Sequence, residues 1–136
     1  MKKLPVLAAL AVSGAIATFS ATNVLAQADA AAAAVDPAVM AAGQPLYQRN
    51  CQACHGDQGQ GGAGERLVGS PIVGTVGGII NQILVGSVEH GMPPFDRLPD
   101  DEIAAIATFV RNSWGNAFGP ITPDQVAAAR GTVGGE

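Results

Sequence analysis

The sequence predicts a small all-α protein. Apolar residues recur at helical spacing in two separate stretches, 79–84 and 103–110. No stretch alternates apolar and polar residues as a half-buried strand would, and no internal repeat is found. The chain has 136 residues, which is enough for one domain with a terminal segment.

Residues 1–26 have the pattern of a secretory signal that is cleaved. Lys2 and Lys3 precede a mostly apolar run, and small residues end the segment at Ala26. An uncleaved membrane anchor is the alternative, but polar residues within 20–23 interrupt the apolar run, which favours cleavage. We therefore expect export and no stable membrane insertion of the mature chain.

The mature chain is acidic and contains no lysine. Cleavage after Ala26 leaves 110 residues with five arginines and 11 acidic residues, a net charge of −6. This charge does not suit binding to nucleic acid or to anionic lipid surfaces.

The first helix is expected to follow an alanine-rich, flexible leader over 27–36. Asp36 and Pro37 have the types of an N-cap and a first helical residue. Pro45 interrupts the pattern, so the helix either starts near Gly43 or is kinked there.

The run Cys51-Gln52-Ala53-Cys54-His55 contains both cysteines of the chain. C-x-x-C-H is the attachment motif of a c-type haem. The two thiols form thioethers with the haem vinyl groups, and the histidine ligates the iron. On a helix, Cys51, Cys54 and His55 can share one face.

Three other kinds of site use two closely spaced cysteines. A redox dithiol is expected near a βαβ pattern, which this sequence lacks. A four-ligand zinc site would need two more ligands, and only His90 remains outside the motif. A disulfide between Cys51 and Cys54 would leave His55 unexplained. Haem attachment is therefore favoured.

Loops and shorter helices are expected after the motif. Residues 56–64 are rich in glycine, but no strand precedes them and no Gly-Lys-Ser/Thr follows, so this is a loop and not a phosphate-binding site. Leu67 and Val68 follow as apolar cover for the haem face. The next helix is expected over 76–86, with Gly86 as its terminator.

Two helices are expected in the C-terminal part. The clearest covers about 100–113, and its acidic first turn complements the helix dipole. Thr122, Pro123 and Gln125 have the types of an N-cap, a first helical residue and a capping-box partner. They predict a short helix over about 123–130.

A haem iron that only carries electrons needs a sixth ligand, and Met40, His90 and Met92 are the candidates. Met92 lies between Gly91 and two prolines, which make a stiff, non-helical loop. Met40 lies on a predicted helix, where core packing is the simpler role. His90 is the rival, and as a second histidine ligand it would lower the reduction potential. We expect His55 and Met92 to be the two axial ligands.

Four motifs together resemble the class I (monohaem) cytochrome c family over residues 38–118. They are Gly43-Gln44-Pro45-Leu46-Tyr47, Cys51-Gln52-Ala53-Cys54-His55-Gly56, Gly91-Met92-Pro93-Pro94-Phe95 and the last helix from Asp101-Glu102-Ile103 to Phe109-Val110-Arg111. The segment from Val110 to Asn116 is similar to cytochromes that serve periplasmic dehydrogenases.

The resemblance implies three to five helices around one haem, within a domain over 37–119 that is followed by an extension over 120–136. It implies that Gly43 and Tyr47 on the first helix meet three residues of the last helix, Ile106, Phe109 and Val110. Glycine at such a crossing lets two backbones approach closely. It also implies that Cys51 and Cys54 hold haem c covalently and that His55 and Met92 ligate its iron.

The sequence departs from the family at two places. The family often has a proline whose carbonyl holds the proximal histidine, whereas this chain has Gly64-Glu65-Arg66-Leu67 there. A carbonyl near Glu65 is expected to serve instead. Pro99 replaces the usual serine or threonine cap of the last helix, which costs about 1 kcal/mol unless Asp100 substitutes.

These observations favour a periplasmic one-electron carrier and not an enzyme. The expected donor is a periplasmic dehydrogenase and the expected acceptor a cytochrome or oxidase, with the chain acting free or as a subunit. A lysine-free acidic surface suits a basic or largely apolar docking surface on the partner. The alternative is a haem enzyme or gas sensor in which the distal ligand is easily displaced.

Overall fold

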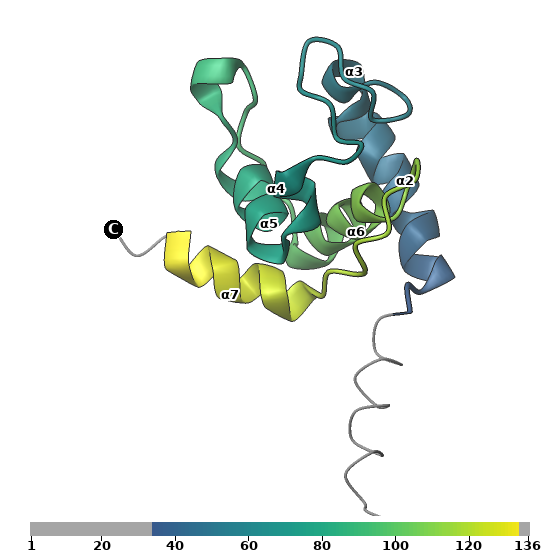
Figure 1. Cartoon of the computed structure of the whole chain (residues 1–136). Coiled ribbons are helices and arrows are strands. Elements are labelled where there is room, and N and C mark those ends of the chain that lie inside the picture. The colour runs from purple at the N-terminus through teal and green to yellow at the C-terminus, as the bar shows by residue number, and fades with distance from the viewer. Residues whose placement is uncertain (1–33, 134–136) are drawn as a thin grey trace, which may run out of the picture.

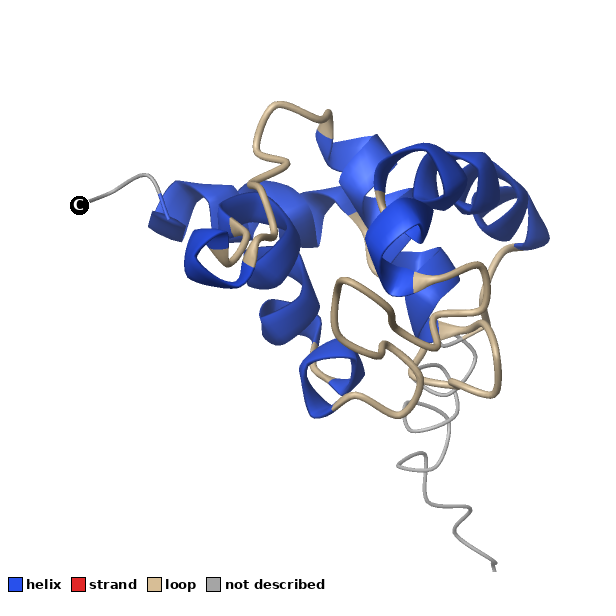
Figure 2. Ribbon diagram, turned by 90° about the horizontal axis from the view of Figure 1, so that it is seen from above, coloured by secondary structure: helices blue, strands red, loops and turns tan. Residues whose placement is uncertain are grey.

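The computed structural model describes residues 34–133, so the expected signal and most of the leader lie outside the described residues. The helices are α2 (Pro37–Asn50), α3 (Gln52–His55), α4 (Pro71–Gly74), α5 (Val76–Val85), α6 (Asp100–Arg111) and α7 (Pro123–Val133), with a short 3-10 helix, η1, at Val88–His90. Helices and loops make up the whole described part (Figure 2). The expected all-α fold is confirmed.

The crossing of α2 and α6 is the most extensive contact between helices (Figure 1). Gly43 lies at the closest point, where an added Cβ would overlap the carbonyl oxygen of Ala105 and lie 2.7 Å from the Cβ of Phe109. Only glycine allows this approach, because any larger residue would force the two backbones apart. The predicted crossing is confirmed for Gly43 and Phe109, and Ala105 is an additional partner.

The core lies where α5, α6 and α7 meet. The apolar stripe predicted for α5 is buried, with Ile80 1% exposed, and it meets Ile103 of α6, which is 0% exposed. Val126 of α7 is also 0% exposed and joins the same cluster. Helix α7 is therefore attached to the core through one side of the helix, at Val126.

The buried side chain of Arg111 joins α6 to α4 and to the segment before α7. The guanidinium of Arg111 donates to the carbonyl oxygens of Val73, Phe118 and Gly119, the first over 2.7 Å and the last over 3.0 Å. Burial lowers the pKa of Arg111. Its hydrogen bonds offset the cost of burying a charge and fix the end of α6 against α4 and the segment before α7.

The N-terminal ends of α2 and α7 have the expected side-chain caps, and α6 lacks one. The Asp36 carboxylate accepts from the backbone N–H of Ala38 over 2.8 Å at the start of α2. Thr122 and Gln125 form the expected capping box of α7. Pro99 gives α6 no side-chain cap, and Asp100 does not replace it.

Two element boundaries differ from the sequence prediction, and one open alternative is decided. Helix α2 starts at Pro37, as the Asp36 and Pro37 pattern predicts, and not near Gly43. Pro45 is tolerated because it is exposed, so water can reach the carbonyl that loses its helical partner. Helix α6 ends at Arg111, earlier than expected, and α7 continues to Val133.

Within residues 34–133, no helix has the length and apolar character needed to cross a membrane.

Candidate haem-binding site

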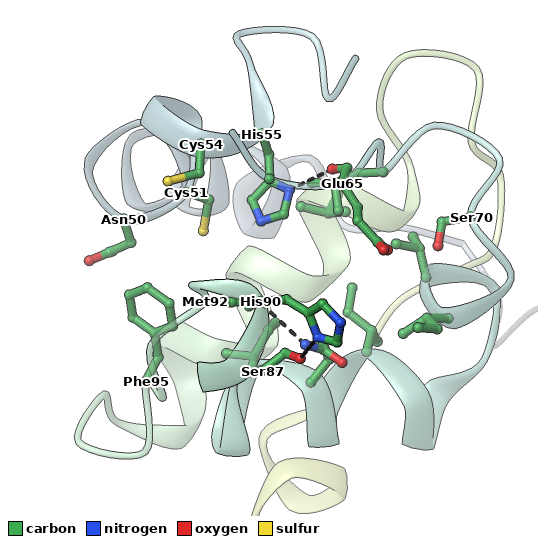
Figure 3. A pocket seen from close by; sticks show the side chains of 18 of the residues that line it. Asn50, Cys51, Cys54, His55, Glu65, Ser70, Ser87, His90, Met92 and Phe95 are labelled. Atoms are coloured by element: carbon green, nitrogen blue, oxygen red, sulfur yellow. Dashed lines mark hydrogen bonds between the residues drawn. The ribbon is translucent and has the colours of Figure 1, made fainter. Parts of the chain in front are cut away.

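A cavity of about 510 Å³ opens between the α2–α3 junction and the segment that follows α5 (Figure 3). This volume is within the range of roughly 300–1,000 Å³ that is usual for small-molecule and cofactor sites. Its walls are mainly apolar, with Ile79 and Ile83 from α5 and Ile106 and Val110 from α6. Leu67 also lines the cavity as expected, whereas the neighbouring Val68 does not.

The first wall carries the C-x-x-C-H motif. Cys51 ends α2 and α3 begins at the next residue, so Cys51, Cys54 and His55 all line the cavity from one side (Figure 3). Both cysteines are free thiols. Burial raises the pKa of Cys51 to about 11, so its thiol is neutral at physiological pH.

A backbone carbonyl fixes the ring of His55. The Nδ1 atom of His55 lies 2.7 Å from the carbonyl oxygen of Glu65. A carbonyl only accepts, so Nδ1 carries the hydrogen and Nε2 is left with a free lone pair, as an iron ligand requires. Gly64 lets the loop pass against the ring, since an added Cβ would lie 2.9 Å from Cε1 of His55. The expected carbonyl acceptor at Glu65 is confirmed.

Tyr47 supports the same wall through its hydroxyl and its ring. Its hydroxyl donates to the carbonyl oxygen of Gly56 over 2.6 Å, and its ring packs against Phe109 and Trp114. Burial is the main cause that raises the pKa of Tyr47 to about 12, so the hydroxyl keeps its proton. From the sequence, Tyr47 was expected only at the helix crossing. A buried tyrosine usually has a hydrogen-bond partner, which was the available signal.

The opposite wall is formed by the segment that contains Met92. The backbone of Met92 exchanges two hydrogen bonds with Ser87, over 2.9 and 3.0 Å, and forms an isolated bridge with it. The backbone N–H of Phe95 donates to Ile83 over 2.9 Å and returns the chain to α5. Gly86 allows this turn, because an added Cβ would lie 2.6 Å from the carbonyl oxygen of Met92. The position of Met92 is therefore fixed at the backbone.

The side chain of Met92 is held as well. The amide nitrogen of Gln82 donates to the sulfur of Met92 over 3.3 Å. Met92 is half-buried and lies across the cavity from His55 (Figure 3). This contact was not predicted from the sequence, because Gln82 and Met92 lie on separate elements that only the fold brings together.

The other two candidate ligands are placed differently. His90 lines the cavity, but its side chain is 74% exposed and its Nδ1 lies 2.8 Å from the hydroxyl of Ser87. The nearest acidic group is Glu89, with an oxygen 3.8 Å away. Met40 is half-buried on α2, outside both the cavity and the hydrophobic core, so the expected core packing is wrong.

The residues of the cavity fit a c-type haem. Two free thiols and a histidine with a free lone pair lie on one side, apolar side chains lie between, and a thioether sulfur lies on the other. Among the described residues, no three histidine, cysteine or acidic side chains come together as a metal cluster. The donor set on the walls of the cavity fits covalent attachment of haem.

A family model described as cytochrome c oxidase, cbb3-type, subunit III, matches residues 38–110, which is more than half of the chain. The chain belongs to this family of class I monohaem cytochromes c. Membership implies a covalently bound haem c and electron transfer through it. The match includes the C-x-x-C-H motif and Met92 but ends before α7. No curated protein matches the chain.

Proposed function

We propose that this cytochrome is an exported, periplasmic one-electron carrier with a single haem c, attached through Cys51 and Cys54 and ligated by His55 and Met92. The observation that carries the proposal is that His55 and Met92 line opposite walls of one cavity and are each held by a hydrogen bond. When bound, the haem supplies an iron that alternates between the ferrous and ferric states.

Ligation by histidine and methionine suits transfer of electrons without chemistry on a substrate. Both ligands are held in place by the protein, by the Glu65 carbonyl for His55 and by Ser87 and Gln82 for Met92. A pre-organised pair of ligands needs little rearrangement when the iron changes charge. A methionine ligand also raises the reduction potential, which favours acceptance of electrons from a dehydrogenase.

The charge of the chain guides the choice of partners. We propose a periplasmic dehydrogenase as electron donor and a cytochrome or oxidase as acceptor, with the chain either free or as a cytochrome subunit. Transient electron-transfer contacts are small. The lysine-free mature chain, with its net charge of −6, favours a basic or largely apolar docking surface on the partner.

Salt separates the two kinds of docking surface. If the partner surface is basic, the association rate falls as the ionic strength rises, because salt screens the attraction. A rate that does not change with salt indicates the apolar surface. A rate that rises with salt would contradict both, since it would mean that the partner is acidic.

Carbon monoxide tests the closed iron site. The holoprotein, produced with its signal in a host that attaches haem c, is reduced and exposed to carbon monoxide. We expect no rapid binding to the unmodified protein and rapid binding to the Met92→Ala variant, in which the sixth position is open. Rapid binding to both would contradict the proposal and favour a haem enzyme or gas sensor with a labile distal ligand.

A further inference from the structure

Asn116 is a buried polar side chain that does not line the haem cavity and lies outside the region matched by the family model. Its side-chain oxygen accepts from the backbone N–H of Gly69 over 2.8 Å. Its side-chain nitrogen donates to the carbonyl oxygens of Val110 over 2.9 Å and Leu67 over 3.3 Å. One amide, with its oxygen and its nitrogen both used, therefore joins the end of α6 to the loop over 59–69, the proximal loop.

The turn before Asn116 has a strained backbone. Trp114 has a φ of 57° and is the one residue other than glycine within 34–133 that lies in the left-handed region. A bulky side chain is disfavoured there, so surrounding contacts must hold this conformation. The indole packs against Tyr47, and an added Cβ on Gly59 would lie 2.6 Å from it. The strained turn is thus held partly by the proximal loop itself.

The proximal loop carries the carbonyl that holds His55. Its two ends meet where the carbonyl oxygen of Gly59 accepts from the backbone N–H of Leu67 over 2.8 Å. Glu65 lies between these ends, with its carbonyl oxygen 2.7 Å from Nδ1 of His55. The segment 114–116 contacts both ends. It therefore adds a long-range support to a wall that is built mainly from residues close in sequence.

We propose that Asn116 is a positioning residue for the proximal iron ligand and acts on His55 through the proximal loop; this inference rests on the proposed ligation by His55. Without the amide, the N–H of Gly69 and the carbonyl of Leu67 lose a partner, and the loop loses an attachment to α6. The Glu65 carbonyl then spends more time away from Nδ1 of His55. That hydrogen bond fixes the ring orientation of a metal-bound histidine, so the ligand is held less firmly.

Two substitutions remove the amide in different ways. Asn116→Leu introduces an apolar side chain of similar shape, so all three hydrogen bonds are lost while the space stays filled. Asn116→Ala leaves space that water can enter, and water can replace part of the hydrogen bonding.

Thr108→Val is the matched control, because it also removes the hydrogen bonds of one buried polar side chain. Thr108 is 0% exposed, and its hydroxyl makes two hydrogen bonds to the backbone of Ile121. Neither bond reaches the proximal loop. The control therefore lowers the stability of the fold without removing a partner of that loop.

The main measurement is the rate at which the Nδ1 hydrogen of His55 exchanges with solvent, followed by NMR in the reduced, diamagnetic holoprotein. We expect exchange about tenfold faster in Asn116→Leu, because local opening of the proximal loop exposes this hydrogen. The increase should be smaller in Asn116→Ala and absent in Thr108→Val. An unchanged rate in either Asn116 variant, or an equal increase in Thr108→Val, would overturn the proposal. If Asn116→Leu yields no folded holoprotein, Asn116→Ala alone decides.

The same spectra distinguish failure of this inference from failure of the proposed function. The ring current of a haem shifts the ring resonances of an axial histidine far upfield, and we expect this shift for His55 in the unmodified protein. If the shift is present and the exchange rates do not follow the expected pattern, only the role of Asn116 is overturned. If the shift is absent from the unmodified protein, His55 does not ligate the iron, and both proposals are overturned.

Discussion

On the proximal side of the cavity, Cys51, Cys54 and His55 lie within five consecutive residues, and the partner of His55 is only ten residues away. On the distal side, Met92 is held by contacts with α5 and with the turn before it. Helix α7 holds the stretch 96–100, which follows that distal segment in the chain. The proximal side is thus mainly a local structure, whereas the distal side depends on the tertiary fold.

One arginine makes the connection between α7 and the distal segment. The guanidinium of Arg130 pairs with Asp100 over 2.9 Å and donates to the carbonyl oxygen of Leu98 over 2.9 Å and to that of Asp96. The stretch that it holds begins four residues after Met92. The family match ends before Arg130, so this support is a feature of the chain beyond the matched region.

The largest expected effect is on haem attachment, and it should affect the proximal side alone. In a Cys51→Ala, Cys54→Ala double variant both thioether positions are lost, so no covalent haem should remain after denaturing electrophoresis and haem staining. Met92→Ala is the control, and it should retain full covalent haem. Loss of covalent haem in Met92→Ala would show that the two sides are not independent.

The helix crossing supports both sides, so a change there should destabilise the whole fold. Gly43→Val places a side chain against the Ala105 carbonyl and Phe109, which should lower the free energy of unfolding by about 3 kcal/mol. Chemical denaturation of the holoprotein measures this loss. Gly77→Ala is the control, because nothing lies within 4 Å of its added Cβ and it should be neutral or slightly stabilising. An equal effect of the two changes would contradict the close crossing.

The distal support should fail without affecting the proximal side. Arg130→Gln removes an ion pair and two hydrogen bonds, which should lower the free energy of unfolding by about 1 kcal/mol and loosen the Met92 segment. Imidazole should then displace Met92 from ferric iron several times more readily. The control is Arg97→Gln, an exposed arginine of the same segment with no ion pair among the described residues. Equal imidazole affinity in the two variants would disprove the role of α7.

The smallest expected effect concerns Tyr47 on the proximal side. Tyr47→Phe removes the hydrogen bond to Gly56 and should cost about 1 kcal/mol near neutral pH. The pKa of Tyr47 is raised to about 12, so its contribution is complete below the ordinary value of 10.0 and is lost as the pH rises toward 12. Urea denaturation of both proteins should show their difference narrowing over that range. A difference that stays constant or widens would mean that the hydroxyl is not buried in its neutral form.

The difference between a local proximal side and a tertiary distal side decides what the sequence could and could not predict. The proximal residues were predictable because adjacent residues share a helix face, and α5 and α6 were predictable from their apolar spacing. Gln82 and Arg130 were not predicted as supports, because their partners are brought close only by the packing of separate elements. Asp100 was considered as a cap for α6, but it pairs with Arg130, and no local pattern reveals that choice.

The central claim is that His55 and Met92 ligate the iron from opposite walls of the cavity and leave it no open position. Its most direct test is the absorption spectrum of the ferric holoprotein beside those of Met92→Ala and His90→Ala. The far-red band of methionine ligation should be present in the unmodified protein, remain in His90→Ala and disappear in Met92→Ala. Survival of the band in Met92→Ala, or its absence from the unmodified protein, would contradict the claim.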